Sequence, residues 1–390
     1  MRKHIAIIGA GPIGLEAALA AKARGYEVSI YERGDIADSV RQWGHVRMFS
    51  PFSMNASEAG IALLKKLGQR VPAPDAILTG AEYAAQYLTP LGQHLGVQTH
   101  TAVQAIARDG AGKRDHIGEP ERGNTTFRLL IETQDGERHD TAGLIFDCSG
   151  TFLNPNPLGD GGIPALGEGS LRKAIRYGLG ETADFSAHLG KRTLVVGGGH
   201  SASTAVVALA KLPRNGGNAG IIWISKKPGP TPCLRIADDP LPERDVLSAA
   251  ANDLVASGTV SFHSDTTVLA LRRNGSGIRA TLRHADGSSS EIETDTIIAA
   301  TGYRPNLTLV RDLHVQTCWA TEGTYKLAAS LLGETGADCL AVAGFGAETL
   351  VHPEPNYFTL GTKSYGRTPD FLIRTGREQI DSLLGSLRGP

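Results

Sequence analysis

Two glycine motifs of the same kind lie far apart in this chain of 390 residues. They read Gly9-Ala10-Gly11-Pro12-Ile13-Gly14 and Gly197-Gly198-Gly199-His200-Ser201-Ala202. Each follows an apolar run that predicts a strand and precedes a stretch that predicts a helix, which is the context in which Gly-x-Gly-x-x-Gly binds a dinucleotide. The glycines let a pyrophosphate approach the N–H groups at the helix N-terminus, and alanine is tolerated at the third position. A single motif could be a turn that binds nothing, whereas two in this context predict two nucleotides.

The end of the second strand in each unit indicates which nucleotide binds there. The first unit ends on Glu32, at the spacing expected of a carboxylate that accepts hydrogen bonds from ribose hydroxyls, which suits the adenosine half of FAD. The second unit has Ser225 at this point, followed by Lys226 and Lys227. Two cations favour a ribose 2′-phosphate and therefore NADPH, although the lysines could also be an ordinary solvated strand end.

Two loops carry residues that could act on a substrate. In the stretch 42–52, His45 or Arg47 could bind an anion or move a proton, while Trp43, Met48, Phe49 and Phe52 could form an apolar, water-excluding wall. The alternative is that these aromatic residues pack the loop against its own domain. In the stretch 230–240, an inert loop cysteine is the expected interpretation of Cys233, but a cation beside a thiol lowers its pKa, so Arg235 makes Cys233 the one cysteine that could be reactive. His352 could reach the mouth of the site or be a plain surface histidine.

The bulk composition excludes several classes of protein. The formal net charge of −1 gives no field that favours nucleic acid or an anionic membrane. The cysteines at 148, 233, 318 and 339 form no Cys-x-x-Cys pair, which argues against a disulfide framework, a zinc site and a redox-active dithiol. The histidines show no metal-ligand spacing, so no metal is expected. The absence of a signal peptide and of a long apolar run favours a cytoplasmic protein.

The motifs must be positioned by a repeated α/β architecture. After each βα unit the chain shows a strand, a hairpin with an Asp-Gly turn and a buried strand that ends near a glycine: 97–103, 126–133 and 143–150 in the first half, then 260–263, 278–283 and 296–302 in the second. This order predicts two Rossmann-like domains, each with a small antiparallel β meander. The second domain, 161–300, is expected to be inserted into the first, 1–160 and 301–390, with a Pro/Gly-rich linker at 154–169. A final strand at 357–361 should lead to a helix from Thr368 to about Leu387, capped by Thr368-Pro369-Asp370.

Together these residues resemble the flavoproteins with two dinucleotide-binding domains, a superfamily that includes thioredoxin-reductase-like enzymes, flavin-containing monooxygenases and lysine and ornithine N-hydroxylases. The resemblance covers nearly the whole chain and rests on the two motifs, Glu32, Ala300-Thr301-Gly302 and the strand that ends at Gly361. It implies that FAD lies along the first domain and that NADPH delivers hydride to the flavin. The cofactor-binding residues expected on this basis are Gly9, Gly11, Pro12, Ile13, Gly14, Glu32, Arg33, Gln42, Trp43, Met48, Val103, Gly150, Gly197, Gly199, His200, Ser201, Ala202, Ser225, Lys226, Lys227, Thr301, Gly302, Gly361, Lys363, Tyr365 and Thr368.

The resemblance leaves the second half-reaction open. Gly361-Thr362 replaces the Gly-Asp that is usual in the disulfide reductases, which favours a monooxygenase that transfers one oxygen from a C4a-hydroperoxyflavin to a small nucleophile. The histidine of the monooxygenase signature Phe-x-Gly-x-x-x-His is also missing. The alternatives are an NADPH-dependent reductase of a disulfide, quinone or protein carrier, and a sensor that binds FAD and NADPH without turnover. A small-molecule substrate is expected in either enzyme, and a homodimer is one oligomeric state open to it.

Overall fold

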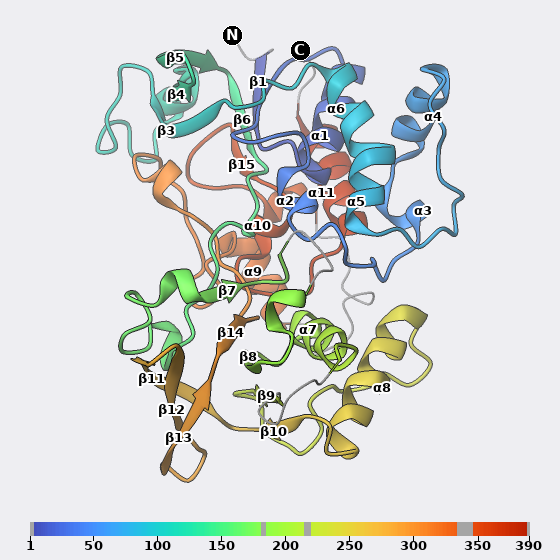
Figure 1. The fold of residues 1–390 in the computed structure, drawn as a ribbon. Coiled ribbons are helices and arrows are strands. Elements are labelled where there is room, and N and C mark those ends of the chain that lie inside the picture. Colours follow the sequence, from blue (N-terminus) through green and yellow to red (C-terminus); the bar gives the residue numbers. More distant parts are fainter. Residues whose placement is uncertain (1–3, 181–184, 214–219, 334–345, 388–390) are drawn as a thin grey trace. The chain divides into compact units, whose positions relative to one another are not determined.

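The computed structural model describes residues 4–180, 185–213, 220–333 and 346–387 (Figure 1). The chain forms two compact units, each of which is discontinuous in sequence. The first comprises Met1–Arg41, Pro51–Asn154 and Arg304–Pro390, and the second comprises Gln42–Ser50 and Pro155–Tyr303. The domain boundaries expected from the sequence, at 160 and 300, fall a few residues inside the main segment of the second unit, which runs from Pro155 to Tyr303. The sequence also placed the segment 42–50 in the first domain, whereas it belongs to the second unit.

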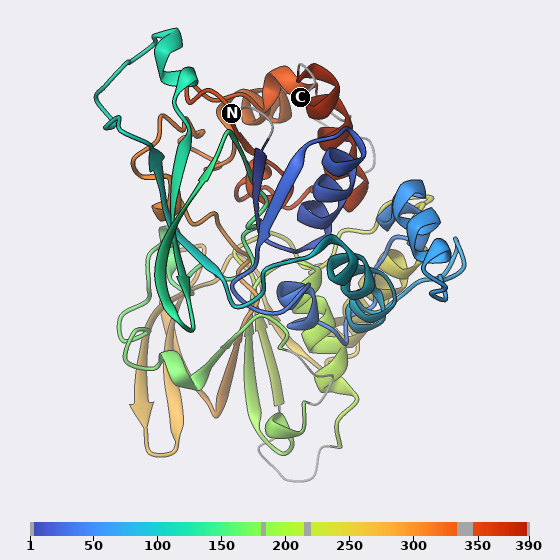
Figure 2. The same cartoon turned by 90° about the horizontal axis from the view of Figure 1, so that it is seen from above.

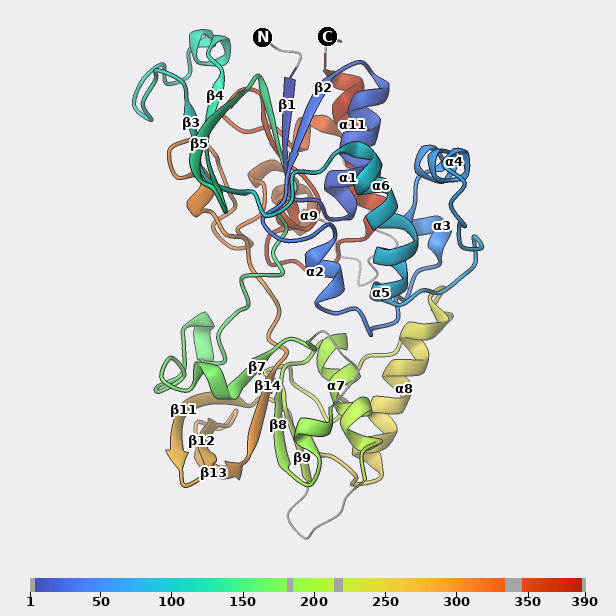
Figure 3. The same cartoon turned by 45° about the horizontal axis from the view of Figure 1, so that its top comes forward.

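The first unit is built on a four-stranded parallel sheet in the order β15-β6-β1-β2. Its strands are β1 (His4–Ile8), β2 (Glu27–Tyr31), β6 (Leu144–Asp147) and β15 (Tyr357–Thr359). Helix α1 (Pro12–Ala23) follows β1 directly and packs against α11 (Ile373–Ser386) (Figure 3). Because all four strands are parallel, their carboxyl ends meet at one edge of the sheet, where a nucleotide would bind.

Short helices connect β2 to the rest of this unit, and another lies near its C-terminal end. A π-helical stretch at Ala84–Leu88 joins helix α5 (Gly80–Tyr83) to helix α6 (Thr89–Leu95), so that the three form one continuous helix. The remaining helices are α2 (Asp38–Arg41), α3 (Phe52–Asn55), α4 (Glu58–Lys66), α9 (Tyr325–Gly333) and α10 (Thr362–Tyr365).

An antiparallel meander covers one face of the first sheet. It consists of β3 (Ala102–Arg108), β4 (Phe127–Thr133) and β5 (Gly136–Ala142), and Figure 2 shows it as a layer beside β1. Ala6 and Ile8 of β1 pack with Phe127, Leu129 and Ile131 of β4 in one buried cluster. The strand expected at 97–103 is wrong in position: Gln98 forms only a bridge to Tyr31, and His100 takes a left-handed φ of 50°, which interrupts any strand before Ala102.

The second unit repeats this plan with a five-stranded parallel sheet in the order β10-β9-β8-β14-β7. Helices α7 (His200–Ala210) and α8 (Pro242–Ala256) pack against each other, and their buried residues form one core with Val195, Trp223 and Ile298 of the sheet. The strands are β7 (Ile175–Tyr177), β8 (Arg192–Val196), β9 (Gly220–Ile224), β10 (Ser261–His263) and β14 (Thr296–Ala299).

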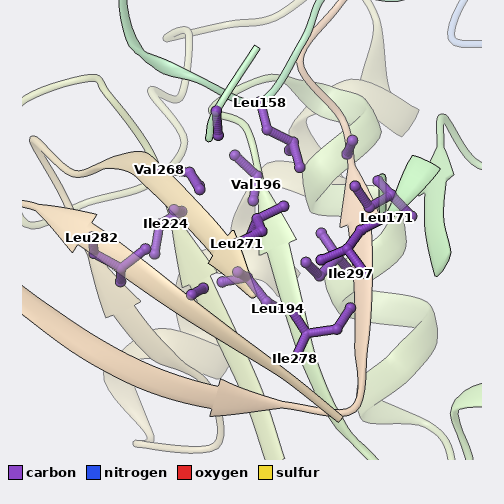
Figure 4. Close-up of a cluster of buried hydrophobic side chains, with 14 residues drawn as sticks. Leu158, Leu171, Leu194, Val196, Ile224, Val268, Leu271, Ile278, Leu282 and Ile297 are labelled. Atoms are coloured by element: carbon purple, nitrogen blue, oxygen red, sulfur yellow. The ribbon is translucent and has the colours of Figure 1, made fainter. Parts of the chain in front are cut away.

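A second meander covers the opposite face of this sheet. It comprises β11 (Thr267–Asn274), β12 (Gly277–Arg283) and β13 (Ser289–Thr294). Leu194 and Val196 of β8 point into the cluster that this meander closes, shown in Figure 4, while Val195 between them packs with the helices. The alternation follows from the two-residue period of a strand buried on both faces.

The final helix begins later than the sequence predicts. Helix α11 starts at Ile373 after the extended residue Leu372, with no side-chain cap, so the Thr368-Pro369-Asp370 cap is wrong. The reason lies upstream: Gly366 has a φ of 69°, and the N–H of Thr368 closes a turn onto the carbonyl of Tyr365. The chain is therefore still leaving α10 at the point where the cap was expected.

Candidate functional site

The carboxyl edge of the first sheet brings the first glycine motif next to Glu32. Oε2 of Glu32 accepts a hydrogen bond of 2.8 Å from the N–H of Ala10, and Oε1 accepts one of 3.0 Å from the N–H of Gly34. Burial raises the pKa of this carboxyl, while the two backbone donors act in the opposite direction. Glu32 thus lies beside the motif at the β2 end of the sheet, as a ribose-binding carboxylate requires.

The glycines of the first motif serve different purposes. Gly9 has a φ of 98°, and a Cβ there would lie 2.7 Å from the carbonyl oxygen of Cys148. A Cβ at Gly14 would collide with the carbonyl oxygen of Gly9, so both residues are needed for internal packing. A Cβ at Gly11 would meet no protein atom within 4 Å. Gly11 is also the N-cap of α1 and makes no side-chain cap there, so the open space above it fits a pyrophosphate.

A buried ion pair occupies the β6 and β15 end of the same edge. Nζ of Lys363 lies 2.6 Å from Oδ2 of Asp147 and donates a 3.0 Å hydrogen bond to Oγ of Ser149. The hydroxyl of Tyr357 also donates to Asp147, at 2.7 Å. Burial acts to raise the pKa of Asp147, but Lys363 and these hydroxyls hold it below its usual value. If Glu32 marks the adenosine end of FAD and Gly11 its pyrophosphate, Lys363 lies on the flavin side.

The other residues expected to hold FAD are spread over this unit. Gly361 has a φ of 70°, and a Cβ there would lie 3.1 Å from Ile13, so it approaches the motif closely. Tyr365 is buried and packs edge-on against Phe371, whereas Val103 packs on the core beneath the first meander. Arg33 is exposed, Pro12 opens α1, Gly150 follows β6 with a φ of 68°, and Thr368 lies in the turn before α11.

The second glycine motif has the same geometry with different chemistry. Gly197 has a φ of 141°, and its carbonyl accepts a 2.7 Å hydrogen bond from Nε1 of the buried Trp223. A Cβ at Gly198 would collide with Oγ of Ser225 and lie 3.2 Å from Cδ of Lys227. A Cβ at Gly199, the N-cap of α7, would meet nothing within 4 Å. Ser225 and Lys227 therefore line the motif directly, and Gly199 matches Gly11 as the open position.

Further charges surround the N-terminus of α7. Partial desolvation lowers the pKa of His200, and the nearby cations Arg244 and Lys227 lower it further. Arg244 is held by Asp239 through hydrogen bonds of 2.7 and 2.6 Å. Sequence reasoning missed Arg244 and Asp239, because nothing in the α8 sequence marks a residue that the fold brings back to the motif. Ser201 and Lys226 are exposed here, and Ala202 is buried in the core.

The segment 42–50 packs entirely within the second unit. Val46 contacts the core beneath α7 and α8, and Phe49 lies edge-on against the ring of His200 with centroids 5.2 Å apart. The ring of His45 meets Phe185 at 6.2 Å, and Nη2 of Arg47 lies 3.4 Å from Glu243. Phe52 belongs to the first unit, where it is buried against Tyr87. Gln42, Trp43 and Met48 are half-buried.

The structure shows no activation of Cys233 by Arg235, in line with an inert loop cysteine and against a reactive thiol. Burial raises the pKa of this thiol, and its Sγ lies 3.0 Å from Oγ of Ser203. Arg235 does not act on it, because its guanidinium forms two hydrogen bonds of 2.7 Å to the carboxylate of Asp245. Asn252 holds the Cys233 backbone on both its N–H and its carbonyl. Cys148 and Cys318 are free thiols, and Cys339 lies outside the described residues.

His352 is not a surface histidine. It is buried, with Nδ1 at 3.2 Å from the carbonyl of Gln316 and Nε2 at 3.1 Å from Oγ1 of Thr359. Since a carbonyl only accepts, Nδ1 carries the proton and Nε2 accepts from the threonine. Burial lowers the pKa of His352 to about 4. The imidazole is therefore neutral at physiological pH.

Thr301 and Gly302 follow β14 and are tied to the linker. Oγ1 of Thr301 donates a 2.6 Å hydrogen bond to the carbonyl of Asn156, whose amide nitrogen donates to the Thr301 carbonyl at 3.1 Å. Gly302 takes a φ of 80°. Thr301 and Gly302 thus lie at the end of the second unit, where Thr301 is hydrogen-bonded to the beginning of the same unit at Asn156.

No helix in the described part of the chain has the length and apolar character needed to cross a bilayer. No group of three His, Cys, Asp or Glu side chains among the described residues is arranged to hold a metal ion.

Comparison with known proteins connects both halves of the chain to one family. Residues 6–114 and 162–325 each match a model described as pyridine nucleotide-disulphide oxidoreductase. No curated protein matches the sequence significantly. Among solved structures, a bacillithiol disulfide reductase from Bacillus cereus is similar with a TM-score of 0.73 and 19% identity, covering 99% of this chain and 98% of its own.

Oxygen-transferring enzymes are also structurally similar. An ornithine N-hydroxylase from Kutzneria sp. 744 gives a TM-score of 0.64 at 16% identity, with 98% of each chain covered. A flavin-containing monooxygenase from Stenotrophomonas maltophilia gives 0.61 at 19% identity, again with 98% of each chain covered. At these identities the likeness extends to the fold of the whole chain.

Proposed function

The chain belongs to the pyridine nucleotide-disulphide oxidoreductases, with FAD and NADPH as its cofactors, and we propose that it reduces a small disulfide at the expense of NADPH. The observation that carries the cofactor assignment is the pair of equivalent positions Glu32 and Ser225. Each lies directly beside its glycine motif, one as a carboxylate and the other as a hydroxyl followed by lysines. The first suits ribose hydroxyls, and the second suits a 2′-phosphate.

The residues of the first unit fit FAD. Glu32 would hold the adenosine ribose, and the α1 N-terminus with Gly11 would hold the pyrophosphate. Gly361, Lys363 and Ser149 would line the flavin end of the edge. When bound, the flavin accepts hydride from a nicotinamide and passes two electrons to an acceptor.

The residues of the second unit fit NADPH. Gly199 opens the α7 N-terminus to a pyrophosphate, while Ser225 and Lys227 would face the 2′-phosphate. Arg244, fixed by Asp239, adds a second cation near His200. These side chains bind and orient the donor.

One observation favours a disulfide as the electron acceptor. The bacillithiol disulfide reductases from Bacillus cereus and Staphylococcus aureus have TM-scores of 0.73 and 0.70, above those of the oxygen-transferring enzymes named here. Without a Cys-x-x-Cys pair, the disulfide would have to meet the flavin directly.

Monooxygenation of a small nucleophile is the second candidate. It is supported by the similarity to the ornithine N-hydroxylase and to the flavin-containing monooxygenase over 98% of the chain. It is also supported by Gly361-Thr362, where disulfide reductases of the resembled superfamily usually carry Gly-Asp.

The test is a two-stage stopped-flow experiment on the FAD-loaded protein. NADPH should bleach the flavin without oxygen, whereas a flavin that stays oxidised would refute the oxidoreductase proposal and leave a binding protein. The reduced protein is then mixed with bis(2-hydroxyethyl) disulfide or with oxygenated buffer. Fast reoxidation by the disulfide supports the reductase. A transient spectrum in oxygen that is neither oxidised nor reduced flavin supports the monooxygenase instead.

A further inference from the structure

A small cavity lies inside the first unit, lined in part by Lys363 of the Lys363–Asp147 pair. Its volume is about 10 Å³, on the order of the space that one water molecule needs. Lys363, Thr324 and Glu322 are among the residues that line it. They come from three points in the C-terminal part of the chain that the hairpin bridge between Thr317 and Thr324 helps to bring together.

Two polar atoms of this lining have no protein partner. Oγ1 of Thr324 and Oε2 of Glu322 are both buried and make no hydrogen bond to any described residue. Thr324 as a whole is only 1% exposed. Leaving two such groups unsatisfied in the interior is costly, so a cavity of this size between them fits a water that bonds to both.

Glu322 connects this cavity with the solvent. Its Oε1 accepts a 2.8 Å hydrogen bond from Nη2 of Arg367, and the side chains of this pair are about one-third exposed. The other carboxylate oxygen is the buried one. A single carboxylate therefore has one oxygen at the surface and one inside.

Lys363 connects the cavity with the flavin edge. Its ammonium gives two of its three donors to Asp147 and Ser149. Ser149 is exposed at the carboxyl end of β6, where the cofactor would lie. One ammonium donor remains for the cavity that Lys363 lines.

We propose that one water bound between Thr324 and Glu322 completes a proton relay from solvent through Glu322 to Lys363 and the flavin edge. This inference rests on the proposed function. Reduction of a disulfide by NADPH consumes one proton besides the hydride, because the S–S bond breaks into one thiol and one thiolate. The relay supplies the proton that converts this thiolate into the second thiol.

The transfer balances without any further reactant. Ser149, which is exposed, gives its hydroxyl proton to the leaving thiolate, forming an S–H bond, and takes a proton from the Lys363 ammonium, which becomes an amine. The Glu322 carboxylate takes up one proton from solvent. The cavity water gives a proton to the Lys363 amine as it takes that one from Glu322, which returns to a carboxylate. One proton moves inward per disulfide, and no electrons move along the relay.

Other titratable groups around Lys363 are held in fixed states. Burial raises the pKa values of Tyr357 and Cys148, which keeps both protonated. His352 is neutral, and Glu354 and Arg367 are both committed to ion pairs. Asp147 stays ionised beside Lys363. Glu322 is therefore the group through which the pair exchanges protons with solvent.

The bound water is tested without turnover by Thr324→Val in the oxidised, FAD-loaded protein. If the hydroxyl holds a water, its loss should lower the urea midpoint of unfolding. If the cavity is dry, replacing an unsatisfied hydroxyl by a methyl group should leave the midpoint unchanged or raise it, and the relay would be refuted.

The relay itself is tested by Glu322→Gln against Arg367→Met, which breaks the same ion pair but keeps the carboxyl. Reduction by NADPH should stay within about twofold of the native rate in both variants. Reoxidation by bis(2-hydroxyethyl) disulfide should fall at least about tenfold in Glu322→Gln, while Arg367→Met stays close to native. Equal slowing in both variants, or none in Glu322→Gln, would overturn the relay.

A second disulfide separates proton delivery from substrate binding. The thiolate released from dithiobis(nitrobenzoate) is stable without a proton, so Glu322→Gln should be oxidised by it at the native rate. A loss equal to that seen with the aliphatic disulfide would mean that Glu322 acts structurally. If the native protein is not reduced by NADPH, or is reoxidised by neither disulfide, the proposed function fails first, which is a different result.

Discussion

Glu32 and Ser225 occupy the same position in two copies of one fold. Glu32 follows β2, whose last residue Tyr31 pairs with Ile8 at the end of β1. Ser225 follows β9, whose last residue Ile224 pairs with Val196 at the end of β8. Glu32 accepts from the N–H of Ala10, the second residue of its motif, and Ser225 lies against Gly198, the second residue of the other. The two units therefore differ in charge at one equivalent position.

Lys227→Ala should weaken NADPH binding about tenfold or more and leave NADH nearly unaffected, because a charged hydrogen bond to the 2′-phosphate is lost. Both lysines are exposed, and the Lys227 side chain lies against Gly198, so Lys226→Ala is the control and should have the smaller effect. Titration of each variant with both nucleotides gives the dissociation constants. Equal losses for NADPH and NADH would contradict a 2′-phosphate role.

Gly11→Val and Gly14→Ala should fail in different ways. A side chain at position 11 meets no protein atom, so Gly11→Val should fold normally and purify without flavin. At position 14 even a methyl group collides with the Gly9 carbonyl, so Gly14→Ala should lower the melting temperature or prevent folding. The flavin spectrum and thermal unfolding read out the two effects. A yellow Gly11→Val protein would refute the placement of FAD.

Acidification should destabilise the first unit through His352. Its pKa is about 4 in the folded protein and about 6.5 when unfolded, so the unfolded state binds the extra proton between these values. Stability is thus fully present above pH 6.5 and falls by roughly 3 kcal/mol as the pH drops to 4. His352→Gln keeps a donor and an acceptor but does not titrate, and its urea midpoint should fall less over this window. If the urea midpoints of the native protein and of His352→Gln fell equally between pH 6.5 and 4, His352 would not be the group that destabilises the protein in acid.

Glu354→Gln should destabilise the protein by about 3–5 kcal/mol. The carboxylate of Glu354 pairs with two buried guanidiniums, at 2.7 Å to Arg108 and 2.9 Å to Arg122, and its replacement leaves both charges uncompensated. Asp109→Asn, which breaks an exposed ion pair with Arg128 in the same meander, is the matched control and should cost under about 1 kcal/mol. Urea unfolding gives the free energy of unfolding of both variants. Similar losses in Glu354→Gln and Asp109→Asn would show that the burial of an ion pair does not determine its contribution to stability.

The features that were predicted from the sequence depend on neighbours in the chain. A strand, a glycine turn and a helix follow one another within about 25 residues, so their pattern identifies both nucleotide-binding units and the residues at their edges. The buried strand before Gly150 was recognised in the same way, but the role of Asp147 at its end was not.

The features that were missed depend on distant residues. Lys363 meets Asp147 across 216 positions, and Arg108 meets Glu354 across 246, so no local pattern indicates either pair. The start of α11 was misplaced because a good capping sequence at Thr368 is outweighed by the turn that leaves α10. The interpretation of Cys233 counted a neighbour in sequence, Arg235, whose side chain is bound to Asp245 instead.

The attachment of 42–50 to the second unit has a mechanical consequence. The polypeptide passes from one unit to the other at four points, after Arg41, Ser50, Asn154 and Tyr303, where a simple insertion would need only two. Any rearrangement between the units must be absorbed by backbone torsions at all four crossings together, and Pro51 stiffens one of them. The nine residues of the segment would move with the second unit, while the chain on both sides of them belongs to the first.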